Sequence, residues 1–168
     1  LRNSQRQDAY LVQSENYEVR FLAATVEYIV ADTNQAAAIL AESYPHTSRN
    51  ALQLDVIDPF ALTLLASVLN VGGKRDAPPD VDGFLPVLQT AGSDGPWVLV
   101  VPSELTVAVS KMTDRDTAAI AEAWRAELSQ WLGFEPTAAD ATEWLVLLRS
   151  RAQAAVLQKR PLLIFAMA

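Results

Sequence analysis

The chain contains no cysteine and only one histidine, His46. The absence of cysteine excludes disulfide bonds, thiolate metal sites and a cysteine nucleophile. A Ser-His-Asp site would have to use His46, and a metal centre would depend almost wholly on carboxylates. His46 follows Pro45 in a turn, where the spacing supplies no partner for a general base, so we predict a surface histidine. We therefore expect no metal, no cofactor and no enzymatic activity.

Long apolar runs are also missing. A membrane-spanning helix needs about 20 consecutive apolar residues, whereas apolar stretches such as 99–101 and 162–168 have the length of strands. No positively charged segment followed by an apolar one, as in a secretory leader, is visible after Leu1. We expect no membrane partner.

Basic residues are scarce relative to acidic ones, and the net charge is −7. The acidity is concentrated in residues 51–110, where Lys74 and Arg75 are the only bases and seven residues are acidic. Nucleic-acid binding needs clustered lysine and arginine, so nucleic acid is a poor partner. A basic protein partner is compatible with this charge, and ordinary solubility charge is the alternative explanation.

The most informative stretch that is present is the last third of the chain. Two amphipathic helix patterns, at 113–132 and 137–159, lead into an uninterrupted apolar end at 162–168. Such a run is typical of a strand buried on both faces of a sheet. We predict that the two helices cover the sheet to which this last strand belongs.

Shorter patterns complete the predicted fold. Thr113 begins a capping box, and Asp58 followed by Pro59 is a typical helix start. The expected helices are 33–43, 59–69, 103–110, 113–132 and 137–159, and the expected strands are 17–21, 25–30, 51–57, 84–89, 97–101 and 162–168. These elements predict an α+β fold: a mixed or antiparallel sheet of about five or six short strands, with helices packed mainly on one face and the C-terminal strand buried. We assign residues 25–168 to a single domain and residues 1–24 to an N-terminal arm or fringe strand.

One long polar loop, residues 72–83, is the main candidate for partner binding. Pro78 and Pro79 stiffen it, which lowers the entropy cost of binding. A stiff acidic loop suits insertion into a basic cleft, and a solvated connection is the alternative. The candidate partner-binding residues are Lys74, Arg75, Asp76, Asp80 and Asp82 in this loop and Asp94 in the following turn.

Three further carboxylates could carry chemistry. Glu127 shares one helical stripe with Trp124 and Trp131, where the aromatic residues are expected in the core. A carboxylate beside them must be solvated or paired, so Glu127 bonds an indole N–H or faces a pocket. Asp55 and Asp58 flank the end of a strand, and Asp58 is expected to cap the next helix. The alternative to a binding protein is a small hydrolase or ligand-binding domain that uses Glu127 or Asp55.

From residue 25 onward the order of features resembles a family of small uncharacterised bacterial proteins. The matching stretches are Tyr28-Ile29-Val30-Ala31-Asp32 before an alanine-rich helix, Ile57-Asp58-Pro59, Gly95-Pro96-Trp97, Pro102-Ser103-Glu104-Leu105, Ala123-Trp124 with Glu127, and Leu145 to Ala152 before the apolar end. The resemblance implies no catalytic residues.

In size, acidity, composition and lack of a catalytic constellation, the chain also resembles immunity factors of secreted actinobacterial toxins. One such factor neutralises the tuberculosis necrotizing toxin, an NAD glycohydrolase. This resemblance implies a cytoplasmic 1:1 inhibitor whose loop occludes the toxin's active cleft. The sequence favours a non-enzymatic protein-binding module, and the resemblance implies that this module is an immunity protein with a basic toxin domain as its partner.

Overall fold

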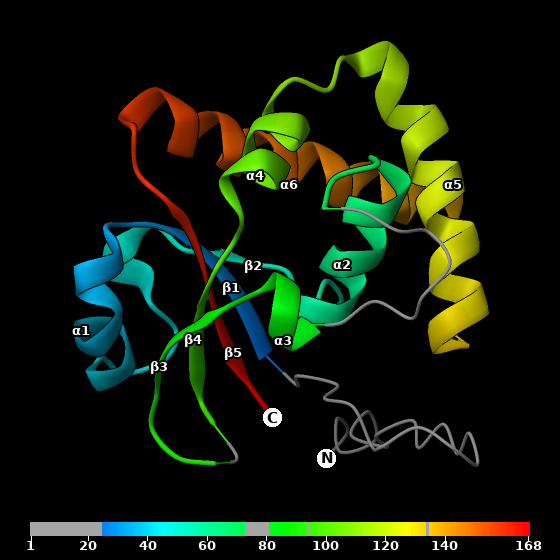
Figure 1. Ribbon diagram of the computed structural model, residues 1–168. Helices are drawn as coiled ribbons and strands as arrows, with labels where there is room; N and C mark the ends of the chain where they lie inside the picture. Colours follow the sequence, from blue (N-terminus) through cyan, green and yellow to red (C-terminus); the bar gives the residue numbers. More distant parts are fainter. Residues whose placement is uncertain (1–24, 73–80, 94, 134) are drawn as a thin grey trace, which may run out of the picture.

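The computed structural model describes residues 25–72, 81–93, 95–133 and 135–168 (Figure 1). In these residues five strands follow one another: β1 (Thr25–Val30), β2 (Leu52–Gln53), β3 (Val87–Thr90), β4 (Trp97–Val100) and β5 (Leu162–Met167). The α-helices are α1 (Ala36–Ala41), α2 (Pro59–Val68), α3 (Val81–Phe84), α4 (Ser103–Ser110), α5 (Asp114–Leu132) and α6 (Ala138–Gln158). Two 3-10 turns, η1 (Thr33–Gln35) and η2 (Thr47–Arg49), flank α1.

The strands form one open sheet in the order β2-β1-β5-β4-β3, and every neighbouring pair is antiparallel. The last strand of the sequence, β5, therefore lies at the centre. Its residues pair with β1 from Thr25↔Met167 to Val30↔Leu162, and with β4 from Trp97↔Ala166 to Val100↔Leu163. The α+β class, the antiparallel sheet and the buried C-terminal strand agree with the sequence prediction.

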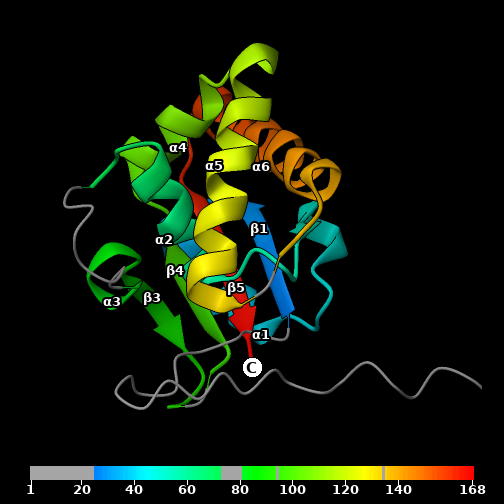
Figure 2. The same ribbon diagram turned by 90° about the vertical axis from the view of Figure 1, so that its right-hand side faces the viewer.

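One face of the sheet carries most of the helices. Figure 2 shows α5 in front of the strands, with α2 and α6 beside it. Alternate β5 side chains, Leu162, Ile164 and Ala166, belong to the core on this face. Trp124 of α5 lies in the same core and is 0% exposed. Burial of such aliphatic and aromatic side chains supplies the main stabilising free energy.

The opposite face is covered by a smaller layer containing α1, which lies on the other side of the sheet from α2 and α5 in Figure 1. The other alternate side chains of β5, Leu163 and Phe165, pack there with Ile39 of α1. Strand β5 is buried on both sides because each face has its own cover. This arrangement explains the unbroken apolar run, and it agrees with helices packed mainly on one face.

Local sequence signals fix the ends of the helices. The side chain of Asp58 accepts a hydrogen bond from the amide of Ala61 at the start of α2. Thr113 forms the predicted capping box with Asp116, and Thr137 forms a second one at the start of α6. Gly133 ends α5 with φ of 62°, a left-handed conformation that glycine adopts without steric cost.

Two of the predicted strands were wrong in extent. The strand expected at 84–89 begins only at Val87, because Phe84 belongs to the short helix α3. The strand expected at 51–57 pairs only at Leu52 and Gln53, and the chain then turns towards α2. Residues 1–24, including the strand expected at 17–21, lie outside the described residues.

In the described part of the chain, no helix has both the length and the apolar character needed to cross a membrane.

Candidate functional site

The predicted partner-binding residues lie almost wholly outside the part of the chain that the structure describes. Residue 82 lies in α3, but its side chain is outside that part as well. The others, also outside the described residues, are Lys74, Arg75, Asp76, Asp80 and Asp94. Their role in partner binding stays a prediction.

Asp55, one of the two residues of the alternative enzymatic hypothesis, holds the edge of the sheet together. Its Oδ1 atom accepts a hydrogen bond from the backbone N–H of Val26 at 3.0 Å. Its Oδ2 atom accepts one from the side chain of Gln53 at 2.7 Å. Both partners belong to strands, so this carboxylate joins β1 to the end of β2.

Asp58 is a buried helix cap and is 3% exposed. Its Oδ1 atom accepts from the amide of Ala61 at 2.7 Å, as the sequence predicted. Its Oδ2 atom is buried with no hydrogen-bond partner among the described residues. Burial raises the pKa of Asp58 to about 6, although the amides of Ala61 and Phe60 favour the charged form. This carboxyl group is costly to keep ionised.

His46 and Glu27 form a buried pair, so the prediction of a surface histidine was wrong. The two residues are 1% and 2% exposed, respectively. The Nδ1 atom of His46 lies 2.5 Å from Oε2 of Glu27, and its Nε2 atom lies 2.7 Å from the carbonyl oxygen of Ile39. The backbone N–H of His46 also donates to Oε1 of Glu27 at 3.2 Å.

The geometry of this pair indicates where its protons lie. A carbonyl oxygen can only accept, so Nε2 of His46 carries a hydrogen and donates it to Ile39. The short contact between Nδ1 and the carboxylate of Glu27 then requires one proton between these two atoms. Every polar atom of the imidazole is therefore satisfied within the fold.

Aromatic side chains close the pair off from water. The ring of Phe165 meets the His46 ring edge to face, with centroids 4.6 Å apart, and Tyr44 stacks on Phe165 at 6.3 Å. A substrate has no access to an imidazole enclosed in this way. The contacts instead fasten the end of α1 and the segment before η2 onto β1.

The sequence did not reveal this pair, because Glu27 was not singled out within the strand expected at 25–30 and His46 was expected at the surface. The available signal was the alternation itself, since Glu27 shares a face with Ile29, and Ile29 packs against α1. Which residue pairs with Glu27 depends on how the chain folds back over 19 residues. The spacing of residues in the sequence does not reveal this.

Glu127 and the tryptophans behave as predicted. The indole Nε1–H of Trp131 donates to Oε2 of Glu127 at 3.1 Å, and Glu127 is partly exposed. Trp124 is fully buried, and its Nε1–H donates to the carbonyl oxygen of Ala61 at 2.9 Å. Among the described hydrogen bonds, none links Glu127 to Asp55 or Asp58. The described residues also include no group of three or more histidine and acidic side chains placed to hold a metal ion.

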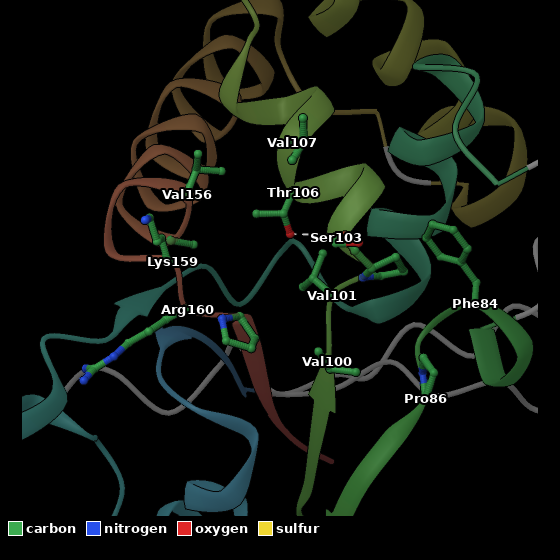
Figure 3. Close-up of a pocket in the computed structure, with 13 residues that line it drawn as sticks. Phe84, Pro86, Val100, Val101, Ser103, Thr106, Val107, Val156, Lys159 and Arg160 are labelled. Carbon is green, nitrogen blue, oxygen red and sulfur yellow. Dashed lines mark hydrogen bonds between the residues drawn. The ribbon is translucent and has the colours of Figure 1, made fainter.

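The structure contains a surface groove that the sequence did not predict, with a volume of about 590 Å³. We call it the α4–α6 groove, because α4 and the end of α6 form its walls. Its lining also comes from α3, from the segment before β3, from the end of β4 and from the residue just before β5. It includes Phe84, Pro86, Val101, Val107, Val156 and Lys159 (Figure 3). The volume is in the usual range for small-molecule sites. Because these residues are scattered in sequence, no local motif signals the groove.

Together these features define an α+β domain with one open antiparallel sheet, buried structural carboxylates and an apolar surface groove. Comparison with family models, with curated proteins and with solved structures gives no match.

Proposed function

We propose that the protein is a non-enzymatic protein-binding module, and within that class an immunity protein that occludes the active cleft of a toxin enzyme. The observation that carries the proposal is the use of the candidate catalytic side chains. Asp55 joins β1 to β2, Glu127 bonds Trp131, and His46 is enclosed with Glu27. Each of these groups has a structural partner in place of a substrate.

The charge of the chain supports a basic partner. The net charge is −7, and the excess of acids is concentrated in residues 51–110. Such a charge accelerates association with a positively charged surface at low ionic strength. On this proposal the protein acts in a bacterial cytoplasm and binds one toxin domain per chain.

The test has two stages, capture of the partner and inhibition of its activity. The tagged full chain is used to isolate a partner from the native host, and the partner is then purified and assayed for its own catalysis. We expect inhibition to be complete at one chain per partner, and association to slow as salt is added. A partner whose activity is unchanged by an excess of the chain would contradict the immunity function.

Two variants sharpen this test. Replacing Asp76, Asp80 and Asp82 by asparagine should slow association without changing the melting temperature, because the three residues act through their charge. The matched control replaces Glu143, an exposed acidic residue of α6, by glutamine, which removes negative charge elsewhere in the chain. Equal association rates for both variants would contradict a role for residues 76–82. Turnover in a hydrolase screen that is abolished by Glu127→Gln would identify an enzyme instead.

A further inference from the structure

The α4–α6 groove leaves apolar side chains open to solvent. Val107 of α4 and Val156 of α6 line it and are 37% and 46% exposed, respectively. Figure 3 shows both valines on the wall above Val100 and Val101 at the end of β4. Exposed valines in the wall of a groove favour an apolar occupant, since its binding would remove both from water.

The lining offers few hydrogen-bond donors to that occupant. Three lining residues, Pro86, Pro102 and Pro161, have no backbone N–H. The N–H groups of Val100 and Val101 donate within the fold, to the carbonyl oxygens of Pro86 and Leu162.

The two hydroxyl groups of the lining are engaged as well. The Thr106 hydroxyl donates to the carbonyl oxygen of Pro102, and the Ser103 hydroxyl donates to Glu104. A peptide bound here would find few donors for its own carbonyl oxygens, at a cost in free energy. An alkyl chain makes no such demand, so the groove suits an alkyl chain better than a polypeptide.

The rim of the groove adds positive charge. Lys159 and Arg160 follow α6 directly, and both are exposed. Arg160 extends away from the apolar lining towards Asp32, 3.7 Å from its carboxylate, whereas Lys159 has no ion pair among the described residues (Figure 3). Glu104 is the other acid beside the groove. The nearby α6 carbonyl oxygens of Ala155 and Val156 accept hydrogen bonds from the backbone N–H groups of Lys159 and Arg160. These hydrogen bonds reduce the repulsion between the carbonyl oxygens and a bound anion.

The backbone conformation at Lys159 is a second indication that this residue has a functional role. Its φ of 54° is left-handed, at a helix end where glycine is the usual residue. A lysine there is sterically unfavourable relative to glycine. Its charge at the mouth of an apolar groove provides a reason for the unfavourable choice.

From these observations we propose that the α4–α6 groove binds a long-chain carboxylate, the anion of an unbranched fatty acid. The alkyl chain lies between Val107 and Val156, and the carboxylate lies at Lys159 with Arg160 beside it. This inference concerns a small molecule and does not depend on the proposed toxin partner.

The experiment titrates the purified full chain with decanoate, below its micelle-forming concentration, by isothermal titration calorimetry. We expect saturable binding of one decanoate per chain. Each methylene removed from the ligand should weaken binding about fourfold, the equivalent of about 0.8 kcal/mol for a buried CH₂. Decanol and decyltrimethylammonium have similar chains without the negative charge, and they should bind at least about fivefold more weakly.

Two pairs of variants test the two ends of the ligand. Lys159→Gly should weaken decanoate binding about fivefold, whereas its control Asn50→Gly removes another left-handed residue, outside the groove, and should not change binding. Val107→Glu should abolish binding, and Val146→Glu, at an exposed position of α6 outside the groove lining, should leave it intact.

Four results would overturn the proposal. The first is the absence of saturable decanoate binding, and the second is equal binding of decyltrimethylammonium or decanol. The third is decanoate binding that neither Lys159→Gly nor Val107→Glu changes, in protein that melts cooperatively. The fourth is a groove that binds an acidic apolar peptide and rejects decanoate.

Discussion

The Nδ1 atom of His46 and the Oε2 atom of Glu27 lie 2.5 Å apart, and water reaches neither residue. The two side chains connect β1 to the segment after α1, so the smaller layer of the fold is held by a polar contact as well as by apolar packing. Removing one member of such a pair leaves a buried polar group without a partner, whereas removing both leaves none.

We therefore predict strong coupling between these two positions. Glu27→Leu and His46→Leu should each lower the free energy of unfolding by about 3–5 kcal/mol. The double variant should lose clearly less than the sum of the two single losses, by more than about 1 kcal/mol. Urea denaturation of all four proteins measures this coupling, and additive losses would mean that the contact contributes little.

The buried carboxyl group of Asp58 predicts a dependence of stability on pH. Its pKa of about 6 in the folded protein exceeds the usual 3.8, so the folded state binds the proton more tightly. This group therefore adds most to stability below about pH 4, and its contribution is lost as the pH rises to about 6. The change of about two pKa units corresponds to roughly 3 kcal/mol.

Asp58→Asn isolates this effect, because asparagine also caps helices well but does not ionise. We expect the variant to match or exceed the parent in stability at pH 7 and to lose the decline in stability between pH 4 and pH 6. The comparison is made by denaturant unfolding across this range, with Glu143→Gln, at an exposed position of α6, as a surface control. An identical pH profile for Asp58→Asn and the parent would contradict the raised pKa.

Trp124 should be a core residue in energetic terms. It is fully buried, contacts Trp144 edge to face at 6.5 Å, and donates a hydrogen bond to Ala61. We expect Trp124→Ala to cost about 3–5 kcal/mol. Trp131→Ala, at a partly exposed position of the same helix, should cost less. Thermal and urea unfolding measure the two losses of stability. Equal stability of Trp124→Ala and the parent would show that this face of α5 serves a role other than core packing.

The central strand predicts the effect of a truncation. Deleting residues 162–168 removes β5 and with it the partner of both β1 and β4. Its buried side chains contribute about 1.5–3 kcal/mol each, which together matches a typical total stability of about 5–15 kcal/mol. We expect no cooperative melt, whereas deleting Ala168 alone, which is exposed, should leave the melt unchanged. Circular dichroism on heating is sufficient to compare the two.

Lys159→Gly should stabilise the protein even as it weakens ligand binding. Lysine at φ of 54° costs about 1–2 kcal/mol relative to a residue without Cβ, and the greater entropy of glycine in the unfolded chain offsets part of the gain. We expect a net gain of up to about 1 kcal/mol in denaturant unfolding. A loss of stability would mean that the Lys159 side chain makes contacts that hold the end of α6.

Local signals explain which parts of the fold could be predicted. The caps at Asp58 and Thr113 and the apolar run of β5 depend on neighbouring residues, so the sequence revealed them. The length of β2 and the burial of His46 depend on which segments meet after folding, and short-range patterns do not contain that information. The α4–α6 groove is the extreme case, since its lining comes from several separate segments of the chain.

The central position of β5 has a consequence for synthesis on the ribosome. Strands β1 and β4 are synthesised before β5, but they are not hydrogen-bonded to each other. Both lack their shared partner until residues 162–167 are made. Until that segment is made, the nascent chain presents two separate half-sheets with unpaired edges, which is the state in which strands pair wrongly with other chains. Such a topology increases the need for chaperone protection during translation. The sheet is completed late, because its central pairings join segments that are distant in sequence.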